Sequence, residues 1–242
     1  MQIETENLYD VFAKYPLKQI DACPCGCNPE DKIHNLQTIP LNNLSAVDLG
    51  HYCGSAIWTW GDEEDFKHFL PRIFEILFEL KEECDISTIL GKLEVAKWNS
   101  WEYDEKIIVS VFLRKWWIEA TKENLNDSSE IFAAIINYIS TPLELLDEWT
   151  KINNERSFRN LVEFIYEESN RILIEEKIWF SKIENRGFPM AYRNWLYSSK
   201  LMELLENAFF QFEKSDKELA EKISICIDII DLNKKIKAGN KR

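Results

Sequence analysis

The sequence predicts an all-α protein, and three observations lead to this fold class. Apolar residues recur with the helical period of about 3.6 residues along nearly the whole chain. The 242 residues include only seven glycines and seven prolines, whereas strand-rich folds need both at frequent turns. Polar residues that favour helix starts stand directly before several apolar runs. We therefore expect about nine helices, packed as an irregular bundle or as a short solenoid of antiparallel helical hairpins.

The expected helices follow from local signals along the chain. The first one stops at Tyr15-Pro16, because the residue before a proline disfavours the helical region. Capping signals open four later helices: Ser45 with Asp48, Asp62, Thr141 with Pro142 and Glu144, and Ser215 with Glu218. The expected helical ranges are 4–14, 45–58, 62–80, 86–97, 102–122, 128–140, 141–153, 155–179, 189–212 and 215 onward. Residues 17–43 are expected to form a Cys-rich polar loop.

We expect residues 1–242 to form a single all-helical domain that ends in a basic tail at 234–242. A chain of this length can bury one good core. A repeat with a fixed period of about 30–50 residues would indicate a regular repeat array, and the sequence contains none. Short connections between the expected helices favour antiparallel neighbours.

The charge of the chain is unevenly distributed. The formal net charge is −13, and the last nine residues carry five positive charges and no acid, so residues 1–233 carry −18. Such a surface repels nucleic-acid phosphates, which must be met by Lys and Arg. It attracts a basic protein partner, whereas the alternative interpretation is that the charge only keeps the protein in solution. We expect a basic protein partner and no nucleic acid.

The sequence also predicts a cytoplasmic protein that does not enter a membrane. Residues 1–6 are acidic, where a secretory signal needs a basic segment followed by an apolar run. The longest apolar stretches fall far short of the roughly 20 residues that span a bilayer. In the cytoplasm the cysteines should be reduced thiols or metal ligands.

Three cysteines close together indicate a candidate metal site. Cys23, Cys25 and Cys27 stand in a loop with proline and glycine, where thiolates can turn towards one centre. Zinc needs four ligands in a tetrahedron, and His34 is the best fourth ligand. His51 and Cys53 are poorer candidates, because two residues apart on a helix they point to different faces. The alternatives are a loop of free thiols and a redox-sensing Cys-x-Cys pair.

The segment 60–72 is the second part of the chain that contains candidate functional residues. Asp65 and His68 stand three residues apart, which places a carboxylate and an imidazole on one helical face. The structural alternative is that Asp62 caps the helix and Asp65 favours its N-terminus. No phosphate-binding glycine loop, zinc-protease helix or nucleophile elbow occurs in the sequence, so we expect a non-enzymatic protein. The candidate partner-binding residues are Trp60, Asp62, Asp65, His68 and Arg72.

The same segment also carries a family resemblance. Trp60-Gly61-Asp62, followed by Asp65-Phe66-Lys67-His68-Phe69-Leu70-Pro71-Arg72, resembles a stretch in an uncharacterised group of bacterial cytoplasmic proteins. That group has a Cys-Pro-x-Cys element after a Tyr-Pro, which Tyr15-Pro16 and Cys23-Pro24 match and Cys25-Gly26-Cys27 does not. The resemblance covers residues 9–78 and implies a family without a known activity.

Two functions from different classes follow. The first is an acidic binding protein, for example an immunity-type inhibitor that neutralises a basic toxin. The alternative is a zinc-binding module or a metal-dependent enzyme centred on residues 23–34.

Overall fold

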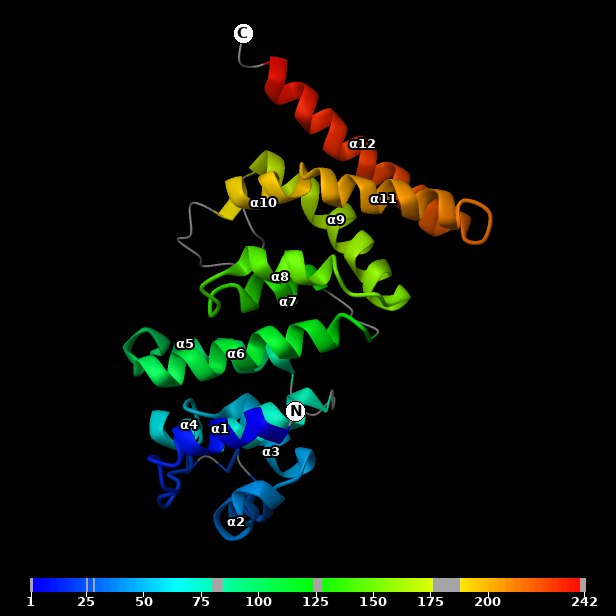
Figure 1. Cartoon of the computed structure of the whole chain (residues 1–242). Helices are drawn as coiled ribbons and strands as arrows, with labels where there is room; N and C mark the ends of the chain where they lie inside the picture. The colour runs from blue at the N-terminus through cyan, green and yellow to red at the C-terminus, as the bar shows by residue number, and fades with distance from the viewer. Residues whose placement is uncertain are drawn as a thin grey trace. The chain divides into compact units, whose positions relative to one another are not determined.

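The computed structural model confirms the all-α fold. It describes residues 2–24, 26–27, 29–79, 85–123, 128–175 and 188–239, and within these ranges it contains twelve α-helices, two short 3-10 helices and no β-strand (Figure 1). The α-helices are α1 (Gln2–Phe12), α2 (Glu30–Thr38), α3 (Ala46–Ser55), α4 (Glu63–Phe78), α5 (Ile86–Val95), α6 (Tyr103–Ala120), α7 (Ser128–Ile135), α8 (Pro142–Trp149), α9 (Glu155–Glu175), α10 (Phe188–Leu196), α11 (Ser199–Phe212) and α12 (Lys217–Gly239).

Two differences explain why the described residues contain twelve α-helices where the sequence indicates ten helical ranges. The loop predicted at 17–43 is wrong in its second half, because α2 forms there. Leu36 is the one buried residue of α2, so the helix has no buried apolar face whose helical period would be visible in the sequence. The helix expected at 189–212 is two helices, because the Ser198 side chain accepts a hydrogen bond from the Leu201 N–H and starts α11 afresh.

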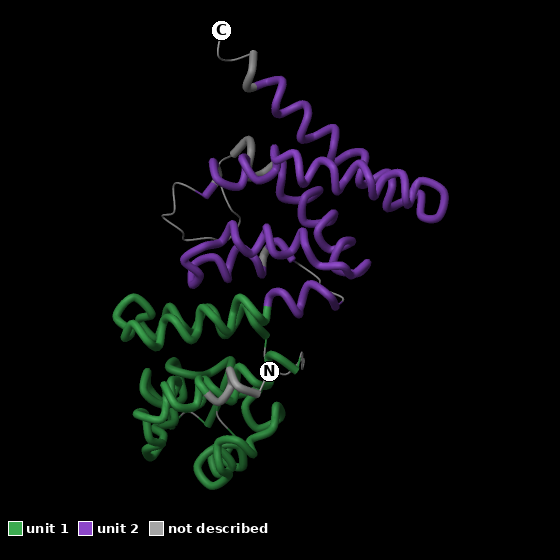
Figure 2. Tube along the Cα trace, viewed as in Figure 1, with its two compact units in different colours: residues 1–116 green, residues 117–242 purple. Residues whose placement is uncertain are grey.

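The chain divides into two compact units, residues 1–116 and 117–242, and the boundary falls inside α6 (Figure 2). The sequence also indicates a weak domain boundary near residues 125–127, which lie outside the described residues. The expectation of a single domain stays a prediction.

Unit 1 is built around α4, which contacts α1 and α3. The apolar face of α4 is buried and consists of Phe66, Phe69, Leu70, Ile73, Phe74 and Leu77. Phe74 stacks on Phe112 of α6 with ring centroids 4.2 Å apart. Burying a side chain of this size contributes about 1.5–3 kcal/mol, so this face stabilises the unit.

Unit 2 is held together by α9, which contacts α7, α10 and α12. Its core is aromatic: Trp117 packs edge-on against Trp149 at 5.0 Å, and Phe132 packs on Phe164 at 5.2 Å. Helix α12 is capped by Asp216, whose carboxylate accepts the Leu219 N–H, and not by Ser215 as the sequence indicated.

None of the described helices combines the length and the apolar character that crossing a bilayer requires.

Candidate functional site

The start of α4 explains why the segment 60–72 needs its particular residues. Asp62 caps the helix by accepting the N–H groups of Glu64 and Asp65, and the Asp65 carboxylate accepts the Asp62 N–H in return. Gly61 has a φ of +68°, and a Cβ on it would lie 2.8 Å from an Asp65 carboxylate oxygen. Any other residue would therefore meet both backbone strain and a steric clash. The turn from Trp60 into α4 requires this glycine.

Further along α4, two polar side chains tie distant segments to the helix. The Nδ1 atom of His68 lies 2.8 Å from the Tyr15 carbonyl oxygen. Arg72 donates from Nε to the Leu44 carbonyl at 2.7 Å and pairs with Glu75 at 2.7 Å. Carbonyl groups in loops need such partners when they are partly buried. His68 and Arg72 thus fasten the segments around residues 15 and 44.

The partner-binding role expected for this segment fits some of its residues and not others. Trp60 and Asp65 have exposed fractions of 1% and 6%, so a partner cannot contact their side chains in this fold. Their burial corrects the expectation for these two residues. Asp62 is exposed, and His68 and Arg72 are half-buried, so direct contact through them stays a prediction.

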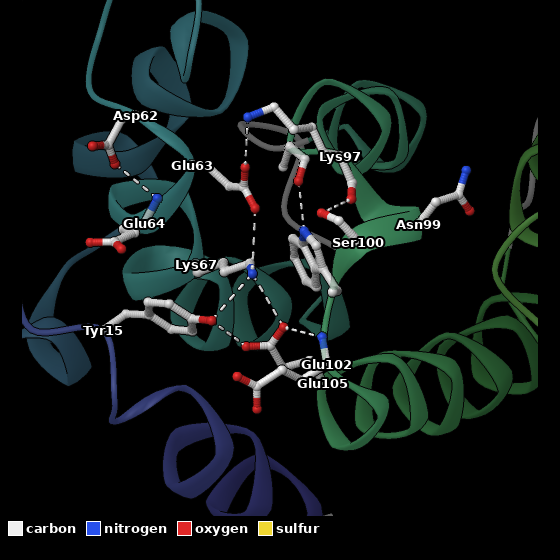
Figure 3. Close-up of polar contacts among 12 residues, drawn as sticks. Tyr15, Asp62, Glu63, Glu64, Lys67, Lys97, Asn99, Ser100, Glu102 and Glu105 are labelled. Carbon is white, nitrogen blue, oxygen red and sulfur yellow. Dashed lines mark hydrogen bonds and ion pairs between the residues drawn. The ribbon is translucent and has the colours of Figure 1, made fainter.

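A buried ionic cluster connects α4, α6 and the segment that follows α1 (Figure 3). The Lys67 ammonium lies 3.2 Å from the Glu105 carboxylate and 3.2 Å from the Tyr15 hydroxyl. Tyr15 donates to the other oxygen of Glu105 at 2.5 Å, and that oxygen lies 3.1 Å from Lys14. The Glu105 side chain is fully buried, so the cluster replaces the water that both charges lose.

The outer part of the cluster lies nearer the surface. Glu63 bridges Lys67 and Lys97, at 3.5 and 3.4 Å (Figure 3). The Lys67 ammonium also lies 4.4 Å from the ring centroid of Trp101, a favourable cation–π geometry.

The electrostatics of the cluster fix the protonation states of its members. Burial and the nearby Glu105 carboxylate raise the pKa of Tyr15 far above its ordinary value. Burial alone would raise the pKa of Glu105, but hydrogen bonds from Tyr15, Lys14 and Lys67 outweigh it and lower that pKa. A general acid or base needs a pKa near neutral pH. The pKa values of Tyr15 and Glu105 are both shifted away from neutral pH.

A second distinctive feature of unit 1 is the turn between α3 and α4. Ile57 adopts a φ of +69°, which is a rare and strained conformation for a β-branched residue. Trp58 follows it and is 70% exposed. The ammonium of Lys92, itself only 1% exposed, lies 3.6 Å from the Trp58 ring centroid and donates to the Ala56 carbonyl at 2.8 Å. The turn therefore exposes the Trp58 ring, and the hydrogen bond from Lys92 supports its backbone.

The predicted metal ligands are only partly described. Cys23 is half-buried and Cys27 is exposed, while Cys25 lies outside the described residues. His34 is exposed on α2. In the part of the chain that the structure describes, no three side chains of His, Cys, Asp or Glu lie together as metal ligands would. The zinc site therefore stays a prediction that depends on Cys25.

Unit 2 contains a shallow pocket between the start of α9 and α11. It is lined by amide side chains such as Asn154, Asn207 and Gln211 and by the rings of Phe158 and Phe212. Its volume of about 240 Å³ lies below the range of roughly 300–1,000 Å³ that is usual for small-molecule sites. We assign no ligand to it.

The candidate residues named from the sequence do not include Lys67, Glu105 and Lys92. A signal for the first two was present, because each stands in register with a buried apolar stripe. Lys67 precedes Leu70 by three residues, and Glu105 precedes Val109 by four. A charged residue on an apolar face predicts a buried partner of opposite sign.

Comparisons with known proteins found no match. No family model, no curated protein and no solved structure matches the chain.

Proposed function

We propose that this is a non-enzymatic binding protein whose acidic surface takes up a basic protein partner, as an immunity-type inhibitor does with a toxin. The observation that carries the proposal is the charge of the exposed surface. Among the described residues of unit 1, eleven exposed side chains are Asp or Glu and only four are Lys or Arg. Such an excess speeds association with a basic protein and opposes association with other acidic molecules.

The excess of acidic residues is a property of the whole unit. Unit 1 contains 20 acidic and 11 basic residues, a net charge of −9. Among its described residues, two lysines (Lys67 and Lys92) and two acids (Asp65 and Glu105) are buried, so their charges cancel. The negative charge of the unit therefore lies on its more exposed residues.

The ionic cluster supports the non-enzymatic part of the proposal. The shifted pKa values of Tyr15 and Glu105 leave both groups poorly suited to acid–base catalysis. Their partners are supplied from within unit 1, so the cluster has a structural role without any substrate.

We also propose that the protein acts in the cytoplasm and belongs to the bacterial group that the segment 60–72 resembles. The free thiols of Cys23 and Cys226 fit a reducing compartment. Exclusion of nucleic acid from its partners follows from the same acidic surface.

The proposal is tested by capture on the immobilised full chain at low salt, followed by reconstitution with each purified candidate partner. We expect a basic protein that binds at one to one and is released as salt shortens the Debye length from about 30 Å at 0.01 M to about 10 Å at 0.1 M. A variant with Asp21 and Asp62 changed to Asn and Glu64 changed to Gln should bind more weakly. A partner that is acidic, or whose binding does not depend on salt, would contradict the proposal.

A further inference from the structure

The turn at residues 56–60 holds Trp58 in one place at a cost in backbone energy. A β-branched residue in the left-handed region is strained, and such strain persists only when surrounding contacts enforce it. Here the Ile57 N–H donates to the Trp60 carbonyl at 3.0 Å, and the N–H groups of Trp58 and Thr59 both donate to Ser55. The Lys92 ammonium fixes the Ala56 carbonyl at 2.8 Å. The turn is rigid, so its exposed ring is preorganised.

One face of the Trp58 ring is covered and the other is open. Lys92 covers the inner face, at 3.6 Å from the ring centroid. With 70% of the residue exposed, the outer face of the indole meets solvent. An exposed tryptophan on a rigid support is the residue type that most often dominates the energy of protein interfaces.

The surroundings of the turn are acidic. The Asp21 carbonyl accepts the Gly61 N–H at 2.8 Å, which brings the exposed Asp21 to the end of the turn. Asp62 follows directly and is exposed as well. Glu64, in the first turn of α4, pairs with Lys18. An open aromatic face beside exposed carboxylates suits a cation with a flat, delocalised group.

We propose that the open face of Trp58 receives an arginine side chain of the basic partner, an inference that rests on the proposed function. The guanidinium group stacks on the indole and its N–H groups face the carboxylates of Asp21 and Asp62. Arginine fits better than lysine, because its planar group can stack and donate hydrogen bonds to carboxylates at the same time. Trp58 then acts as the anchor, and the remaining acidic surface steers the partner towards it.

The test uses the full chain and a fluorescein-labelled peptide with four arginines spaced by Gly-Ser pairs, followed by fluorescence anisotropy. We expect Trp58→Ala to weaken binding by about three- to tenfold, which corresponds to a cation–π contact at a partly exposed site. Trp58→Phe should retain part of the affinity. The matched control is Tyr103→Ala, because Tyr103 is 80% exposed on α6 of the same unit, and its loss should change binding by less than about twofold. The lysine version of the peptide should bind several-fold more weakly.

Each other outcome overturns a defined part of the inference. Salt-dependent binding that is equal in the wild type and in Trp58→Ala would overturn the role of Trp58 and leave the proposed function standing. Equal affinity for the arginine and lysine peptides would overturn the assignment to arginine. If neither peptide binds at about 0.01 M salt, the inference fails, and the capture experiment still decides the proposed function separately.

Discussion

Replacing Lys67 by methionine should destabilise unit 1 strongly, although no surface feature changes. Methionine keeps the length of the side chain and removes its charge, so Glu105 remains buried without the buried cation of its cluster. Breaking a buried ion pair from one side costs about 3–5 kcal/mol, because an uncompensated charge is left behind. Glu105 keeps the Tyr15 hydroxyl, Lys14 and the Glu102 N–H as partners. We therefore expect a loss near the lower end, about 3 kcal/mol in the free energy of unfolding.

Urea unfolding followed by circular dichroism measures this loss, and hydrogen exchange of peptides from α4 assigns it to unit 1. The matched control is Lys97→Met. Lys97 also pairs with Glu63, but its side chain is 76% exposed, so its loss should cost less than about 1 kcal/mol. The double variant Lys67→Met/Glu105→Gln should be more stable than Lys67→Met alone, because it leaves no unpaired buried charge. Equal losses for Lys67→Met and Lys97→Met would refute the view that the buried cluster stabilises the unit.

Three further predictions concern single residues. Gly61→Ala should lower the free energy of unfolding by about 1–3 kcal/mol, because of the positive φ at this position and the contact with the Asp65 carboxylate. Gly91→Ala, in an open helical position, should raise it by roughly 0.5–1 kcal/mol. Thermal unfolding of both variants measures the difference. The pKa of Glu105 is lowered in the folded state, so its ionised form contributes stability above the pKa of the unfolded chain, and this contribution is lost as the pH falls through the folded value; Glu105→Gln should show a weaker acid-side loss in a pH series. Burial raises the pKa of the Cys226 thiol to about 12, so a thiol reagent at about pH 8 should label it only after unfolding, as peptide mapping by mass spectrometry would show.

The sequence was sufficient for the fold class and for the elements with strong local signals. The capping box at Ser45 and the cap at Asp62 are present as predicted, because a cap depends on side chains within one helical turn. Helix α2 could not be predicted, since one buried residue does not create a period. The partner of Lys67 could not be predicted either, because Glu105 is 38 residues away and only the packing of α4 on its neighbours brings the two together.

The segment 60–72 acquires a different meaning once its contacts are known. Gly61, Asp62 and Asp65 build the turn and the cap, Lys67 joins the buried cluster, and His68 and Arg72 fasten loops. Every one of these roles is satisfied inside unit 1. A recurrence of this segment in other proteins would therefore report a shared helical unit and not a shared activity. Residues that bind a partner should instead be exposed and should not be needed to form the turn or the helix cap. Trp58, two positions before the segment begins, is exposed in this way.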